Sequence, residues 1–82
     1  AIEDFDIAIE LNPKFDKAYS NRGLAKSRLG NYKGAIEDYT TAIGINPDFA
    51  IPYKNRGIAK EKLGDKAGAQ QDYEKYNELN RK

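Results

Sequence analysis

The chain repeats itself with a period of 34 residues, and this constrains its fold more than any other feature. The motif Tyr-x-Asn-Arg-Gly at residues 19–23 recurs at 53–57. In the same register, 13 of the 33 comparable positions from Asp16 onward are identical, and residues 1–15 match residues 35–49 at 9 of 15 positions. Agreement this extensive in one register indicates a stack of copies of one structural unit.

Each period contains two predicted helices. Apolar residues follow helical rather than alternating spacing over residues 16–29 and again over 32–45. Gly30 separates the two, as expected of a glycine that ends a helix with a positive φ. Pro47 ends the second helix because proline disfavours α geometry in the residue before it. The next helix tolerates Pro52 in its first turn. Loops of a few residues force neighbouring helices to run antiparallel.

The order of residues within the period resembles the tetratricopeptide repeat over the whole chain. The complete copy shows the pattern at Tyr19, Gly23, Leu29, Gly30, Tyr32, Ala35, Tyr39, Ala42 and Pro47. The following copy shows it at Tyr53, Gly57, Leu63, Gly64, Ala69 and Tyr73. The resemblance implies an all-α fold, an α-solenoid of antiparallel helix pairs wound as a right-handed superhelix. With A and B for the first and second helix of a repeat, the five helices read B-A-B-A-B.

The register divides the chain into three units. They are the second helix of a truncated repeat, a complete repeat and a C-terminal repeat, at residues 1–15, 16–49 and 50–82. The last helix is polar, since Gln70 and Asn77 stand where the previous copy has Ile36 and Ile43. A polar outer face is what a terminal repeat needs. We therefore interpret the C-terminus as the natural end of an array and the N-terminus as a cut.

The sequence lacks the residue types that most often carry enzymatic chemistry. The chain contains no His and no Cys, the residues that most often serve in acid–base catalysis and as soft metal ligands. Acidic residues recur at one repeat position, in the pairs at 3–4 and 37–38 and at Asp72, and we predict that they face solvent. No glycine-rich phosphate loop is present. We expect no enzyme activity, no cofactor and no metal site.

Nucleic acid and membrane are disfavoured as partners. Fourteen basic residues against thirteen acidic ones leave a net charge of +1, far from the basic excess of a nucleic-acid binder. The six tyrosines could stack on bases, but four of them, Tyr19, Tyr39, Tyr53 and Tyr73, fall at the packing positions of the repeat. No apolar run approaches the roughly 20 residues that cross a bilayer. The polar face of the first helix is acidic, the wrong sign for anionic lipid. We expect a cytoplasmic location.

The resemblance implies that the first helix of each repeat lines a concave groove, the usual binding face of solenoids. The inward positions are then Lys17, Ser20, Asn21, Leu24, Ser27 and Arg28, followed by Ile51, Lys54, Asn55, Ile58, Glu61 and Lys62. The candidate peptide-binding residues are Lys17, Asn21, Leu24, Arg28, Lys54, Asn55, Ile58 and Lys62. Asparagine can hold an extended backbone and the cations favour acidic ligands, so we predict a protein-interaction scaffold for an acidic or C-terminal peptide. Any one of these residues could equally be an ordinary solvated helix residue.

Some family members clamp a terminal carboxylate with a set of Lys, Asn and Arg. Leu24 stands where that set has a second Asn, and Ile51 stands where it has Lys. The resemblance therefore gives no support for chaperone-tail specificity.

Two arginines, Arg22 and Arg56, occupy a position where the family often has Leu. Aspartate recurs in register at positions 4, 38 and 72. We hypothesise that the arginines pair with these aspartates between helices. Such partly buried pairs would fix geometry more than add stability.

The alternative function is a structural or self-associating array segment with no separate ligand. The first helix carries Ile2, Phe5 and Ile9, yet its usual partner helix is not in the chain. Burying one such side chain stabilises by about 1.5–3 kcal/mol. We predict a homodimer through residues 1–15, formed face to face about a two-fold axis or by exchange of the first helix. Fraying of this helix is the rival outcome.

Overall fold

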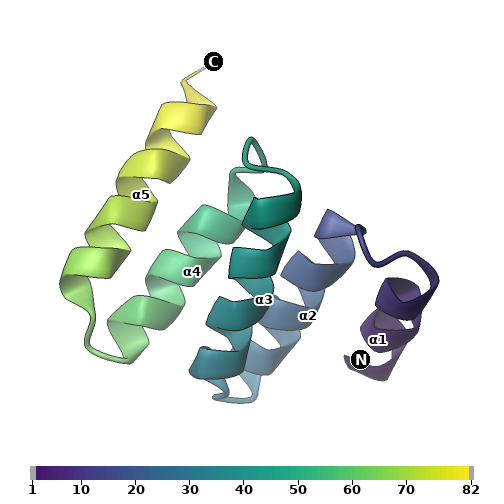
Figure 1. Ribbon diagram of the computed structural model, residues 1–82. Helices are drawn as coiled ribbons and strands as arrows, with labels where there is room; N and C mark the ends of the chain where they lie inside the picture. The colour runs from purple at the N-terminus through teal and green to yellow at the C-terminus, as the bar shows by residue number, and fades with distance from the viewer. Residues whose placement is uncertain (1, 82) are drawn as a thin grey trace.

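The computed structural model describes residues 2–81, which form five α-helices and no strand. The helices are α1 (Ile2–Leu11), α2 (Asp16–Arg28), α3 (Tyr32–Ile45), α4 (Ile51–Lys62) and α5 (Lys66–Asn80). Consecutive helices run antiparallel and follow one another across the molecule from α1 to α5 (Figure 1). The predicted all-α solenoid is confirmed. Ala1 and Lys82, at the ends of the outer predicted units, lie outside the described residues.

The A-type helices α2 and α4 end in the same way, because both are followed by a glycine with positive φ. Gly30 has φ of 84° and Gly64 of 88°, a backbone region that other residues rarely adopt. Asn31 and Asp65 then cap the following B-type helices, where each side chain accepts a hydrogen bond from the backbone N–H three residues on, at 3.0 and 2.9 Å. Pro52 lies in the first turn of α4, as predicted.

The two helices of a repeat approach each other at a glycine. A Cβ atom on Gly23 would lie 2.8 Å from Cε1 of Tyr39, and one on Gly57 would lie 2.7 Å from Cε1 of Tyr73. The core around these contacts is small and rich in alanine. Its buried apolar residues are Ala18, Ala35, Tyr39, Ala42, Tyr53, Ala59 and Ala69. Gly23 and Gly57 therefore mark points of close contact between the two helices of each repeat.

The four tyrosines at repeat packing positions are buried to different extents. Tyr39 is fully buried and Tyr53 is 8% exposed, whereas Tyr19 and Tyr73 are half-buried. The two buried tyrosines, Tyr39 and Tyr53, are therefore core residues rather than platforms on which bases could stack.

Helix α1, like α5 at the other end, has a single neighbour among the described helices and packs on α2 alone. None of its residues is buried. Helix α3, its equivalent one repeat later, packs between α2 and α4. Because α1 has one neighbouring helix where α3 has two, its side chains are more exposed than those of α3.

Candidate functional site: the surface of the A-type helices

The two A-type helices contact each other directly, so their outer sides belong to one surface. Residues spaced i, i+4, i+7 and i+11 share one side of a helix. In α2 and α4 this spacing selects equivalent residues, which we call the A-helix surface. They are Lys17, Asn21, Leu24 and Arg28 from α2, and Ile51, Asn55, Ile58 and Lys62 from α4.

Most of the predicted peptide-binding residues are accessible. Lys17, Asn21, Arg28, Lys54, Ile58 and Lys62 are exposed, and Leu24 and Asn55 are half-buried. Ser20, which we expected to line the groove, is only 3% exposed, and that prediction is wrong. Ser20 is too short to reach solvent from this helix position, whereas the equivalent residue Lys54 is long enough. Whether these residues hold a peptide stays a prediction.

Two residues of α4 are drawn toward α5. The Lys54 ammonium lies 5.7 Å from the ring centroid of Tyr76, a cation–π distance. The Tyr73 hydroxyl donates a hydrogen bond to the Glu61 carboxylate. Burial and this carboxylate together raise the pKa of Tyr73 to about 12. Sequence reasoning missed the Lys54–Tyr76 contact, although the replacement of Ala42 by Tyr76 in the repeat was its signal.

Charge alternates along the stack of helices. Helices α2 and α4 each carry four basic residues and one acidic residue, whereas α1 carries four acidic residues and no basic one. The net charge of +1 does not reveal this pattern, because the positive charges of α2 and α4 nearly cancel the negative charges of the other helices. Four of the basic residues of α2 and α4 are exposed, namely Lys17, Arg28, Lys54 and Lys62. These exposed cations favour acidic ligands.

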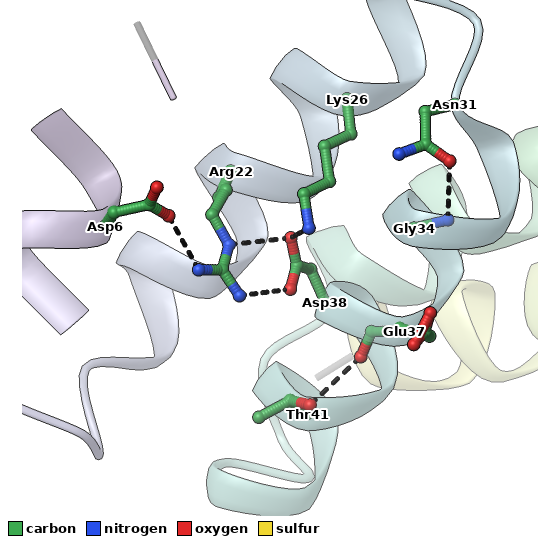
Figure 2. Close-up of polar contacts among 8 residues, drawn as sticks. All are labelled: Asp6, Arg22, Lys26, Asn31, Gly34, Glu37, Asp38 and Thr41. Carbon is green, nitrogen blue, oxygen red and sulfur yellow. Dashed lines mark hydrogen bonds and ion pairs between the residues drawn. The ribbon is translucent and has the colours of Figure 1, made fainter. Parts of the chain in front are cut away.

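A polar cluster joins three helices at Arg22 (Figure 2). Arg22 donates from Nε and Nη2 to the two carboxylate oxygens of Asp38, at 2.9 and 2.7 Å. Its Nη1 donates to Asp6 of α1 at 2.8 Å, and Lys26 Nζ lies 3.2 Å from Asp38. Asp38 is 4% exposed, and its carboxylate raises the pKa of Arg22 above the ordinary arginine value.

The second repeat contains an equivalent cluster at Arg56. Arg56 contacts Asp72 at the same 2.9 and 2.7 Å, and Lys60 lies 3.2 Å from this carboxylate. Arg56 Nη1 donates to the Thr40 hydroxyl at 3.2 Å. The predicted pairing of both arginines with repeat aspartates is confirmed at Asp38 and Asp72.

Two details of the acidic residues differ from expectation. The prediction that Asp38 and Asp72 face solvent is wrong, because an arginine and a lysine from the preceding helix cover each carboxylate. Arg22 reaches back to Asp6 rather than to Asp4. Sequence reasoning missed Asp6, Thr40 and the two lysines as partners. The Ala-Lys pair that recurs in both A-type helices was the available signal for the lysines.

The exposed apolar residues of α1 are not the three expected to mediate self-association. Ile2, Phe5 and Ile9 are half-buried. Ile7 and Leu11 are 56% and 82% exposed. Self-association through the first three stays a prediction.

An open hollow of about 550 Å³ lies where α1 meets the end of α2. Its lining is mainly apolar and consists of Ile2, Glu3, Ala25, Arg28 and Leu29. The predicted groove residue Arg28 therefore also borders this hollow. Leu29 is 76% exposed at its edge.

The described residues contain neither a candidate metal site nor a candidate membrane-spanning helix. Within residues 2–81, no three or more His, Cys, Asp or Glu side chains group in a way that could hold a metal ion. No helix over the same residues combines the length and apolar character needed to cross a membrane.

Comparison with solved structures gives strong matches to helical repeat domains. A structure described as MamA has a TM-score of 0.93 at 32% identity, covering 98% of this chain and 47% of that one. The first TPR of Spaghetti (RPAP3), bound to the HSP90 peptide SRMEEVD, has a TM-score of 0.93 at 28% identity, with 95% and 62% covered. The complex of the TPR2B domain of yeast Sti1 with pHsp70 has a TM-score of 0.94 at 25% identity, with 96% and 63% covered.

The present chain thus spans less than two thirds of the length of each of these three structures. No curated protein matches it in a sequence search. Two family models, both described as tetratricopeptide repeat, match residues 16–49 and 53–82. Together with the five-helix solenoid and its glycine contacts, these matches show that the chain belongs to the tetratricopeptide repeat family.

Proposed function

We propose that this chain is a protein-interaction module that binds an extended acidic peptide along the A-helix surface. The observation that carries the proposal is the charge on the exposed side of α2 and α4, which contact each other. Four cations are exposed there against one exposed carboxylate, Glu61; the cations are Lys17, Arg28, Lys54 and Lys62. Asn21 and Asn55 recur at the same place in the two helices. Each can donate to and accept from the backbone of an extended peptide.

Similar structures support the chemical class of the ligand. The peptide SRMEEVD in the RPAP3 complexes carries two Glu and one Asp against one Arg. The present surface differs from a terminal-carboxylate clamp, since it has Leu24 and Ile51 at two of the clamp's polar positions. With Ile58 38% exposed beside them, we infer a ligand that combines acidic residues with one aliphatic side chain.

Titration of short labelled peptides tests this proposal. We expect a seven-residue peptide of acidic residues around one Leu to bind, and the same peptide with Gln and Asn in place of Glu and Asp to bind about tenfold more weakly or worse. Added salt should weaken the binding of the acidic peptide. Equal affinity for the two peptides would contradict the charge assignment.

A matched pair of chain variants localises the binding. Lys17→Gln removes a cation from the A-helix surface, and Lys33→Gln removes an exposed cation from α3. We expect the first to weaken the acidic peptide several-fold and the second to leave it unchanged. Equal losses in both variants would mean that net charge, not this surface, attracts the peptide.

The second candidate function is an array segment that contacts only other copies or other helices of its own kind. The exposed Ile7 and Leu11 of α1 favour it, because apolar side chains in water promote association. The two functions separate in solution. Peptide binding by a monomer supports the first, whereas a dimer that binds no acidic peptide supports the second.

A further inference from the structure

One contact differs between the two otherwise equivalent arginine clusters. Arg22 Nη1 donates to the Asp6 carboxylate at 2.8 Å (Figure 2), whereas Arg56 Nη1 donates to the Thr40 hydroxyl at 3.2 Å. Asp6 and Thr40 are 34 residues apart, so they occupy the same position of the repeat. The copy that follows has Glu74 there. Thr40 is thus a neutral residue at a position that is acidic in both neighbouring copies.

The two clusters differ in charge as a result. In the first cluster, an arginine and a lysine contact two carboxylates, those of Asp6 and Asp38. In the second cluster, Arg56 and Lys60 contact one carboxylate among the described residues, that of Asp72. The second cluster therefore retains one positive charge that the first does not. A negative group at Thr40 would balance this charge as Asp6 does in the first cluster.

The Thr40 hydroxyl is suited to carry such a group. Thr40 is exposed, and it lies on α3, which packs between α2 and α4. Two hydrogen bonds to Asp72 already orient the Arg56 guanidinium. A phosphate on a threonine carries close to two negative charges at neutral pH and three acceptor oxygens, and it forms charge-assisted hydrogen bonds with a nearby arginine. On Thr40 these acceptors would lie beside a donor that is already in place.

We propose that Thr40 is a phosphorylation site whose phosphate pairs with Arg56 and ties α3 to α4. A protein kinase transfers the γ-phosphoryl group of ATP to Thr40 Oγ1. The bond from Oγ1 to phosphorus forms, the bond from the γ-phosphorus to its bridging oxygen breaks, ADP leaves with that oxygen, and the hydroxyl proton passes to a base of the kinase. Thr40 is not part of the A-helix surface, so this site and the proposed peptide site can fail independently.

The neighbouring Thr41 provides a matched control. It is also exposed, but its hydroxyl donates to the Glu37 carbonyl oxygen at 3.0 Å (Figure 2). Glu37 lies within about one turn of both threonines, so its charge affects a phosphate at either position. Chains synthesised with phosphothreonine at position 40 or at position 41 therefore differ chiefly in the access of the phosphate to Arg56.

Thermal melts compare the two phosphorylated chains. We expect the chain with phosphate at Thr40 to melt about 4 °C or more above the chain with phosphate at Thr41, since only the first gains a bond between helices. Arg56→Gln should remove most of this difference. A difference that persists in full without Arg56, or no difference in the parent chain, would overturn the pairing.

Phosphorus NMR detects the pairing without any substitution in the chain. A nearby cation favours the doubly charged phosphate, so its second pKa should be lower at Thr40 than at Thr41. Equal pKa values at the two positions would overturn the proposal even if Arg56→Gln does not fold.

Mass spectrometry of the protein isolated from its own cells tests whether the modification occurs. Fragment ions of a peptide that spans both threonines distinguish Thr40 from Thr41. We expect the phosphate on Thr40. Finding Thr40 only in its unmodified form, or the phosphate only on Thr41, would contradict the assignment.

Discussion

The two repeats share their Arg–Asp contacts between helices but differ at individual positions of the exposed surface. The clusters at Arg22 and Arg56 have the same contacts to aspartate, at 2.9 and 2.7 Å. On the A-helix surface, by contrast, Lys17 is replaced by Ile51 one repeat later. The internal contacts set the geometry of the helix pair, while the surface positions are free to set ligand specificity. Variants of equivalent residues test this separation directly.

The largest effect is expected when a buried carboxylate is removed. Asp38→Ala leaves Arg22 and Lys26 partly buried without their shared partner, and Asp72→Ala does the same to Arg56 and Lys60. Breaking such pairs costs about 3 kcal/mol. We expect similar losses in the free energy of unfolding from the two variants, measured by urea denaturation. A loss at one position only would show that the two clusters are not energetically equivalent.

Overpacking at the glycine contacts should show whether the second helix of each repeat can shift to make room for a larger side chain. Gly23→Val pushes against the Tyr39 ring of α3, which is held between two helices, and should cost about 1–3 kcal/mol. Gly57→Val pushes against α5, which packs on α4 alone and can shift outward, so its cost should be smaller. Thermal melts measure both variants. An unchanged melting temperature for Gly23→Val would show that the buried register is wrong.

The equivalent tyrosines Tyr39 and Tyr73 differ in their hydroxyl groups. The buried Tyr39 hydroxyl has no hydrogen-bond partner among the described residues, whereas Tyr73 donates to Glu61. Tyr39→Phe should therefore be neutral or stabilise by about 1 kcal/mol, and Tyr73→Phe should destabilise by up to about 1 kcal/mol. Denaturation at neutral pH compares them. Equal destabilisation by both variants would count against this difference.

Alkaline pH sharpens the Tyr39 comparison. Burial, with a smaller contribution from Asp38, raises the pKa of Tyr39 to about 12, above the unfolded value near 10. A group whose pKa is raised by folding contributes stability below its unfolded pKa and loses it as pH rises toward the folded value. Stability should thus fall between about pH 10 and 12, and Tyr39→Phe should remove part of that fall.

The smallest effect is expected at the junctions between repeats. Asp6→Ala removes an ion pair whose carboxylate side is 50% exposed, which is worth about 0.5 kcal/mol. Thr40→Ala removes a longer, neutral contact to Arg56 and should cost less. Denaturation at low and high salt separates the two variants, since only the Asp6 effect should shrink with salt.

Local signals in the sequence accounted for most of the fold. Gly30 and Pro47 predicted where helices end, and the recurring Arg and Asp predicted the pairs between helices. Some contacts between helices could not be predicted from these local signals. The burial of Asp38 depends on Lys26 reaching back over it, and the contact of Lys54 with Tyr76 depends on how α5 is placed. Such features follow from side-chain reach across helices, which the order of residues alone does not specify.

Peptide binding by the double variant Asn21→Ala, Asn55→Ala tests the central claim most directly. The variant is compared with Asn77→Ala, an exposed asparagine of α5. We predict that the double variant weakens binding of the acidic peptide by about 1–3 kcal/mol, the cost of leaving a hydrogen-bonding group unpaired, with unchanged helicity, and that Asn77→Ala binds as the parent does. Full affinity in the double variant would contradict binding along the A-helix surface.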